Sequence, residues 1–197
     1  MALLDTLEEQ SLLRKEDDEQ LEDGDKSIPA SRILDLGTGN GHMVFTLEEE
    51  GWAGELVGTD YSEPSVLLCR QIAASKLGHD SSLRFEEWDL LNDPPGEWLG
   101  DGFDAVLDKG TFDAVSLSSE TDGQGRRIVE CYREKVVPLI KKGGFFIITS
   151  CNWTKEEVLN WFAVPGGDLR YFDEARYPTF TFGGQKGQSV CTLVFRR

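Results

Sequence analysis

The chain has 197 residues, enough for one domain with a substantial hydrophobic core. Its formal net charge of −16 and isoelectric point near 4.5 argue against a nucleic-acid partner, because affinity for nucleic acid depends on Lys and Arg neutralising phosphates. The same charge would attract a basic macromolecule, although many proteins are acidic only for solubility.

The four cysteines and two histidines give no sign of a metal site or a disulfide framework. No two cysteines form a C-x-x-C pair, and His42 and His79 do not have ligand spacing. No apolar run is long enough to span a bilayer, and residues 1–20 carry charges where a signal peptide needs an apolar core. We therefore expect no metal, no membrane association and reduced thiols in a cytoplasmic protein, with the nucleus as the alternative location.

Residues 1–31 are acidic, with scattered leucines and no Trp, Phe or Tyr. A short amphipathic helix fits residues 3–14, whereas residues 16–26 have the composition of a solvated segment. We expect residues 1–31 to be a mobile N-terminal segment and residues 32–197 to form the folded domain.

From residue 32 onward, strand-like and helix-like stretches alternate, which is typical of a parallel sheet with helical crossovers. The first predicted strand, residues 33–36, leads into Gly37, Gly39 and Gly41, spaced G-x-G-x-G. A dinucleotide pyrophosphate is wrapped by G-x-G-x-x-G instead, so this spacing favours a ligand without a diphosphate. Asp35, beside the glycines, suits an ammonium group better than a phosphate. Three glycines in a turn are also common where the turn has only a structural role and binds no ligand.

Three more acidic residues follow predicted strands. The strands and their acids are 55–59 with Asp60, 83–87 with Asp89, and 103–107 with Asp108. Asp60 comes ~25 residues after Asp35, close to the spacing that places a carboxylate over a ribose diol. Because ligands of such sheets bind beyond the carboxyl ends of the strands, we expect all four acids to converge on one cleft.

The second half of the chain continues the alternation. We predict helices over residues 126–137 and 154–162, the latter opened by a Thr-x-x-Glu capping box, and a strand buried on both faces over residues 145–149. Two strand-like runs at the end, residues 179–182 and 190–195, predict a terminal hairpin that supplies an antiparallel edge to the sheet.

This order of features resembles the class I, seven-strand methyltransferases that use S-adenosylmethionine. The resemblance covers residues 32–197 and implies a doubly wound, Rossmann-like α/β sheet with strand order 3-2-1-4-5-7-6 and strand seven antiparallel. It also implies that the glycine loop passes beneath the methionine part of the cofactor, while the later acids bind the ribose and the adenine. The implied cofactor-binding residues are Asp35, Gly37, Gly39, Gly41, Asp60, Tyr61, Asp89 and Leu90.

Longer stretches indicate a narrower family. Residues 108–114 (DKGTFDA) and 150–157 (SCNWTKEE), together with residues 180–184, resemble the protein-lysine methyltransferases that modify translation elongation factor 1-alpha. The resemblance implies that this factor is the substrate and that the enzyme is a monomer meeting it transiently. Members usually carry a longer, aromatic-rich segment before the glycine loop, so residues 1–31 lead us to expect a shortened form.

The implied reaction is attack of a lysine amine on the methyl carbon of the sulfonium cofactor, without a metal. Free lysine has a pKa of about 10.4, so only about one amine in 10³ is neutral at pH 7, and the enzyme must promote deprotonation and alignment. We expect the loop of residues 108–113 to form the pocket around the amine. Asp108 or Asp113 would orient the amine, and Phe112 would form one wall of the pocket. The alternatives are that Asp108 only anchors the loop and that Phe112 is a core residue.

Other roles and functions stay open at this stage. Asn152 and Trp153 are interpreted as the mouth of the pocket, with packing at the helix entry as the alternative role for Trp153. Lys109 is interpreted as a loop or surface residue. Besides the lysine methyltransferase, two functions remain: a methyltransferase for another protein or a small molecule, and a non-catalytic form that binds the cofactor or a partner.

Overall fold

The computed structural model describes residues 2–17, 29–77, 83–178, 180–182, 185–187 and 190–197. The strands are β1 (Ile33–Leu36), β2 (Leu56–Asp60), β3 (Arg84–Glu87), β4 (Phe103–Lys109), β5 (Ile140–Ser150), β6 (Arg170–Glu174), β7 (Phe180–Phe182), β8 (Gln185–Gly187) and β9 (Cys191–Arg196). The helices are α1 (Ala2–Glu9), α2 (His42–Glu49), α3 (Glu63–Leu77), α4 (Thr111–Leu117), α5 (Ile128–Val136) and α6 (Lys155–Phe162), with 3₁₀ turns η1 (Glu97–Leu99) and η2 (Val137–Leu139).

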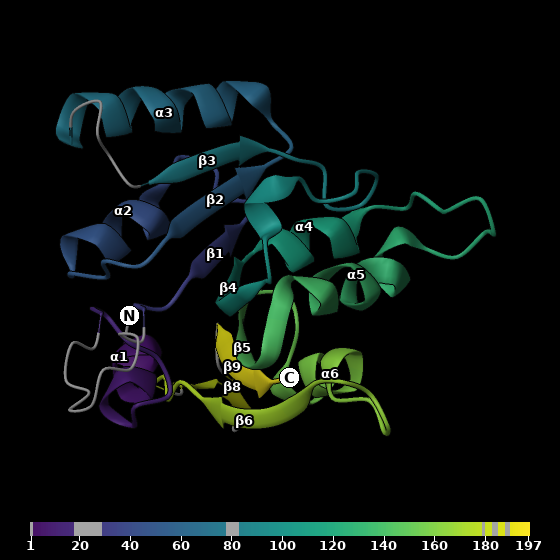
Figure 1. Ribbon diagram of the computed structural model, residues 1–197. Coiled ribbons are helices and arrows are strands. Elements are labelled where there is room, and N and C mark those ends of the chain that lie inside the picture. Colours follow the sequence, from purple (N-terminus) through teal and green to yellow (C-terminus); the bar gives the residue numbers. More distant parts are fainter. Residues whose placement is uncertain (1, 18–28, 78–82, 179, 183–184, 188–189) are drawn as a thin grey trace.

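Seven of these strands form one sheet in the order β3-β2-β1-β4-β5-β9-β6, with helices on both faces (Figure 1). The strands from β3 to β5 are parallel, and β9 is antiparallel to both of its neighbours, β5 and β6. The predicted doubly wound sheet, its strand order and its antiparallel seventh strand are therefore confirmed. Every residue of β1 and β2 is buried, as expected for strands covered by helices on both faces.

The helices bury a separate apolar cluster on each face of the sheet. Helices α4, α5 and α6 cover one face, where Phe112, Tyr132 and Phe162 meet Phe146 and Phe195 in an aromatic core. Helices α1, α2 and α3 contribute to the cluster on the other face. The sheet is thus held rigidly from both sides, and its carboxyl edge is left for a site.

The N-terminal helix α1 is part of the second cluster. Leu4, Leu7 and Leu13 are at most 3% exposed, and they join the cluster that contains Ile147 and Val194 of the central strands. Backbone and side-chain hydrogen bonds tie residues 14–17 to residues 30–31 ahead of β1. The predicted short helix is present, but its packing into the domain was not predicted. Residues 18–28, where most of the predicted solvated stretch falls, lie outside the described residues.

The predicted terminal hairpin is wrong. The run in β7 pairs with β8 in a separate two-stranded sheet, and the edge strand beside β9 is β6, which the sequence did not predict. The sequence of β6, RYFDE, has little apolar alternation, because an edge strand needs to bury only part of its side chains. Pairing with β9, and not local pattern, makes this segment a strand.

The predicted loop over residues 108–113 is also wrong in its local structure. Asp108 and Lys109 continue β4, because they pair with Ile148 and Thr149 of β5. Gly110 then takes a left-handed conformation with φ of 87°, and Thr111 begins α4 directly. The chain turns here through a single glycine, which fixes the following helix tightly against the end of the strand.

Candidate active site

A cavity of about 350 Å³ lies at the carboxyl ends of β1, β2 and β3 and is closed from above by α4. Five of the predicted cofactor-binding residues line it: Gly37, Asp60, Tyr61, Asp89 and Leu90. The structure therefore brings together residues from three separate strand ends, as the alternation of strands and helices predicts. Asp35, Gly39 and Gly41 do not line this cavity.

Asp60 stands at the junction of the cavity and the glycine loop. Its carboxylate accepts hydrogen bonds from the backbone N–H of Gly39 and of Ser62, both at 2.9 Å, and its side chain is buried. Each carboxylate oxygen has a further lone pair, so these bonds leave acceptor capacity for a ligand. Tyr61, the next residue, is 78% exposed and lines the cavity mouth. An exposed aromatic ring beside a fixed carboxylate suits a nucleoside, which has a flat ring and a hydroxylated sugar.

Asp89 organises the opposite wall. It accepts hydrogen bonds from the Leu91 N–H and the Asn92 side-chain amide, both at 2.8 Å. Burial tends to raise the pKa of Asp89, but the bonds from Asn92 and Leu91 outweigh it and lower the pKa below the ordinary value. No acceptor for the Leu90 N–H is found among the described residues. This wall thus offers an ionised carboxylate and a free donor side by side.

The three glycines of the loop have different surroundings. A Cβ on Gly37 would lie 2.2 Å from Thr111 Oγ1, which donates to the Leu36 carbonyl at 2.6 Å, so Gly37 permits the close approach of α4. A Cβ on Gly41 would lie 2.7 Å from the Phe45 ring and 3.0 Å from Cys69 Sγ. Gly41 therefore permits the close packing of α2 and α3 at this point. A Cβ on Gly39 would meet nothing within 4 Å, although φ is 57°. Gly39 therefore leaves open space for a ligand beside the loop, and the residues present fit the predicted cofactor.

Asp35 is buried beneath the loop. Its carboxylate accepts a hydrogen bond from Thr38 Oγ1 at 2.7 Å, and burial raises its pKa to about 7, with neighbouring Asp108 adding to the effect. It lines neither this cavity nor the next one, so its predicted contact with an ammonium group stays a prediction. Asp35 is close enough to Asp60 and Asp108 to interact with them electrostatically, but the four acids do not line one common cavity, so their expected convergence on one cleft is not found.

A second cavity, of about 610 Å³, lies beyond the ends of β4, β5 and β9 and is walled on one side by α1. Leu3, Leu4 and Thr6 of α1 line it opposite Asp108 and Lys109. The predicted interpretation of Lys109 as a surface residue agrees with its exposure, although it also lines this cavity. This cavity and the first one share no lining residue in the described part of the chain, but both lie at carboxyl ends of the parallel strands.

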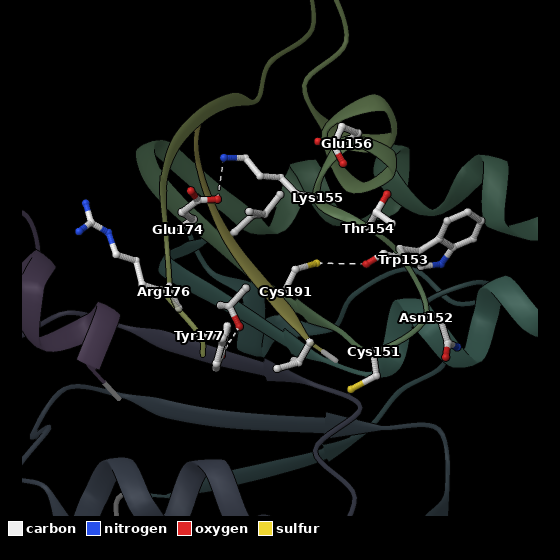
Figure 2. A pocket seen from close by; sticks show the side chains of 14 residues that line it. Cys151, Asn152, Trp153, Thr154, Lys155, Glu156, Glu174, Arg176, Tyr177 and Cys191 are labelled. Carbon is white, nitrogen blue, oxygen red and sulfur yellow. Dashed lines mark hydrogen bonds and ion pairs between the residues drawn. The ribbon is translucent and has the colours of Figure 1, made fainter. Parts of the chain in front are cut away.

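A third cavity, of about 780 Å³, adjoins the second on the side of α6 (Figure 2). Asn152 and Trp153 line it, as predicted for a pocket mouth, and Trp153 also packs against Phe112 and Trp161. Lys155 forms an ion pair with Glu174 at 2.7 Å across it (Figure 2). Trp153 therefore has the packing role that the sequence offered as its alternative, and its place at the mouth of the amine pocket stays a prediction.

All three predicted catalytic residues are engaged by other groups of the protein, the two acids through hydrogen bonds and Phe112 through packing. Asp108 accepts hydrogen bonds from the Tyr132 hydroxyl at 2.6 Å and from the Thr111 and Phe112 N–H groups, and burial raises its pKa to about 6. Asp113 accepts a hydrogen bond from Ser150 Oγ at 2.5 Å and from the Cys151 N–H at 2.8 Å. Phe112 is 1% exposed within the aromatic core, which favours its alternative role as a core residue.

Sequence reasoning missed several residues of the first cavity. They include Thr59, Asn92, Thr111, Ala114 and Val115. Thr111, Ala114 and Val115 are spaced three and four residues apart, so they lie on one face of α4. That spacing would have identified them if a helix had been predicted to start immediately after Gly110.

The fold and the site together define a class I S-adenosylmethionine-dependent methyltransferase. Residues 28–184 match the methyltransferase domain family. A TehB-like S-adenosylmethionine-dependent methyltransferase from Corynebacterium glutamicum has the same fold, with a TM-score of 0.60, 18% identity and coverage of 85% of this chain and 80% of that one. S-adenosylmethionine is accordingly the cofactor of this class.

Two curated relatives narrow the assignment. The chain is 40% identical over 163 residues to the protein-lysine N-methyltransferase EFM4 of Saccharomyces cerevisiae, covering 83% of this chain and 69% of the relative. It is 38% identical over 165 residues to the human EEF1A lysine methyltransferase 2, covering 84% and 65%. The chain belongs to the family of these lysine methyltransferases.

Proposed function

We propose that this chain is a protein-lysine N-methyltransferase that transfers a methyl group from S-adenosylmethionine to a lysine of translation elongation factor 1-alpha. The observation that carries this function is the 40% identity to the yeast lysine methyltransferase over most of the chain. The geometry supports it, because Asp60, Tyr61 and Asp89 line one cavity at the carboxyl ends of β1 to β3, and a second cavity lies at the ends of β4 and β5.

We assign the nucleoside to the cavity lined by Asp60 and Asp89. The spare lone pairs of Asp60 would accept from the ribose hydroxyls, and Tyr61 would lie against the adenine ring. The Asp89 carboxylate and the free Leu90 N–H would pair with the amine and the ring nitrogen of the adenine edge. The open space beside Gly39 would admit the methionine part of the cofactor.

When bound, S-adenosylmethionine supplies an electrophilic methyl group on a sulfonium. The protein's own task is to hold a lysine amine in line and unprotonated, and positioning is a large contribution when reacting groups are held in contact. Asp108 and Asp113 are already engaged by hydroxyl and backbone donors, so we assign them to holding the ends of β4 and β5 in place. Neither carboxylate is free to pair with an ammonium, a pairing that would raise the pKa of the lysine and slow the reaction.

The test is transfer of tritium from labelled S-adenosylmethionine to recombinant elongation factor 1-alpha. The Asp60→Ala variant should bind the cofactor poorly and give no label, whereas Asp93→Ala, an exposed acid nearby, should behave as the wild type. Label on other proteins or small molecules, but not on the factor, would contradict the proposed substrate. Cofactor binding without label on any acceptor would favour the non-catalytic form.

The proposal also covers the cellular location and the oligomeric state of the chain. No helix among residues 2–17, 29–77 and the later described stretches is long and apolar enough to cross a membrane. The net charge of −16 opposes binding to nucleic acid, and the four cysteines, all unpaired, are consistent with a reducing compartment. We propose a cytoplasmic monomer, which size-exclusion chromatography with light scattering and microscopy of a tagged chain would test.

A further inference from the structure

Three hydroxyl groups form a continuous hydrogen-bonded chain between the second and third cavities. Thr149 Oγ1 lies 2.8 Å from Thr192 Oγ1, which in turn lies 2.7 Å from the Tyr177 hydroxyl. Thr149 and Thr192 are register partners on β5 and β9, and Tyr177 follows β6. Figure 2 shows Tyr177 at the lower side of the third cavity, with a dashed line for its hydrogen bond. Strand pairing therefore assembles the chain from three distant parts of the sequence.

The hydroxyl chain faces the hollow beside α1. Thr149, Thr192 and Tyr177 all line the second cavity, and Tyr177 and Thr192 line the third as well. Thr192 is 5% exposed, whereas Thr149 and Tyr177 are only partly buried. The middle hydroxyl is thus a fixed anchor, and the two outer hydroxyls are accessible from the cavity.

We propose that the second cavity receives the side chain of the substrate lysine, and that the Thr149 and Tyr177 hydroxyls orient its amine nitrogen, with Thr192 positioning both. This assignment rests on the proposed lysine methyltransferase function. Thr149 and Tyr177 are hydrogen-bonded to the same oxygen, so their own oxygens lie within two hydrogen-bond lengths of each other. One nitrogen can then contact both oxygens at ordinary hydrogen-bond distances.

The chemistry of hydroxyls fits a neutral amine. A hydroxyl rotates its proton to suit its partner, so Thr149 and Tyr177 can both donate to Thr192 and keep their lone pairs for the two N–H groups of the amine. The nitrogen lone pair is then directed away from the hydroxyls. A neutral acceptor also stabilises the ammonium form less than a carboxylate does, so it favours the reactive form.

Two of the acids around the cavity are engaged by other groups of the protein. Asp108 is engaged by Tyr132 and backbone donors, and Glu174 is paired with Lys155. The charged residues that line the cavity are Asp108, Lys109, Asp173, Glu174 and Arg176. Because both signs of charge line this cavity, we assign the uncharged nitrogen to the hydroxyls of Thr149 on β5 and Tyr177 after β6.

The test compares hydroxyl removal with hydroxyl retention. Tyr177→Phe and Thr149→Val should each lower kcat on elongation factor 1-alpha at least about tenfold, because each removes one acceptor that aligns the nitrogen. Thr149→Ser, which keeps the hydroxyl, should stay within about threefold of the wild type. Tyr171→Phe, a matched change on the exposed part of β6, should have no effect. The Kd for S-adenosylmethionine should be unchanged in all four variants, and circular dichroism should show each chain folded at the assay temperature.

A second measurement separates this site from the proposed substrate. n-Butylamine, which carries the four carbons and the amine of a lysine side chain, is titrated into the chain saturated with S-adenosylhomocysteine and followed by NMR. We expect weak binding that the Tyr177→Phe, Thr149→Val double variant weakens by at least about fivefold. Butylamine binding with this dependence, but no label on the factor, would support the lysine site and contradict the substrate. Wild-type kcat in Tyr177→Phe and Thr149→Val, equal loss in Thr149→Ser, or no butylamine binding would overturn the site.

Discussion

At the two ends of the sheet's carboxyl edge, the functional groups are held by hydrogen bonds that differ greatly in the sequence separation of their partners. At the β1, β2 and β3 end, Asp60 and Asp89 accept hydrogen bonds from Ser62 and Leu91, two residues further along the chain. At the β4, β5, β9 and β6 end, Asp113 accepts from Ser150, 37 residues away, and Thr149 meets Thr192, 43 residues away. Short-range turns therefore shape much of the first end, although Asp60 also accepts from Gly39, 21 residues away, whereas the second end depends mainly on bonds between distant strands.

This difference separates binding of the cofactor from alignment of the substrate. A local turn keeps its shape under small changes elsewhere, so the cofactor end should respond mainly to substitution of its own acids. The substrate end depends on α1, β5 and β9 together, so distant changes should affect it. The four predictions that follow, from the largest expected effect to the smallest, test this separation.

The largest effect is expected from Leu7→Ala in α1. Leu7 is 2% exposed in the cluster that contains the central strands, so we expect a loss of about 2–5 kcal/mol in the free energy of unfolding, measured by urea denaturation. Glu9→Ala, an exposed change on the same helix, should stay within about 0.5 kcal/mol of the wild type. Equal stability of the two variants would mean that α1 does not support the substrate end.

Asp60→Ala should weaken binding of S-adenosylmethionine about 30-fold to 100-fold, as measured by calorimetry. The change removes the acceptor for the ribose and also leaves the Gly39 and Ser62 N–H groups without their partner. The Asp93→Ala control should bind within about twofold of the wild type. An equal Kd for both variants would place the cofactor elsewhere.

Asp113→Asn should act on the opposite end. An asparagine cannot accept from both Ser150 Oγ and the Cys151 N–H, so we expect a loss of about 1–3 kcal/mol in stability and a lower kcat. The Kd for the cofactor should stay within about twofold of the wild type, because Asp113 itself does not line the first cavity and its partners, Ser150 and Cys151, lie at the end of β5. A loss of cofactor affinity like that of Asp60→Ala would break the separation between the two ends.

The smallest effect concerns the pH dependence of stability. Burial raises the pKa of Asp35 to about 7 in the folded chain, above its value of about 3.9 when unfolded. Between these values the folded chain keeps a proton that the unfolded chain has lost, so the free energy of unfolding falls as the pH rises through this window.

Asp35→Asn should remove that contribution. The slopes of stability against pH between pH 5 and 7 should differ by about 1 kcal/mol per pH unit, the variant being flatter. Asp108, whose pKa burial also raises, titrates in both chains, so the difference reports Asp35 together with its coupling to Asp108. Parallel curves would show that Asp35 is ionised throughout this range.

The local motifs determined much of the architecture. The glycine spacing, the acids at the carboxyl ends of the predicted strands, the capping box of Thr154 and Glu157 and the apolar run in β5 are patterns of neighbouring residues, so they can be recognised in the sequence. The same features placed Asp60, Tyr61, Asp89 and Leu90 at one cavity, because parallel strands bring their carboxyl ends to one edge.

Only the tertiary structure decided the rest. It made RYFDE an edge strand by pairing it with β9, buried the leucines of α1 against the central strands, and engaged Asp108 and Asp113 with Tyr132 and Ser150. It also joined Thr149, Thr192 and Tyr177 into one chain of hydroxyls. These contacts join residues far apart in the sequence, and no local propensity encodes which distant strand a segment will meet.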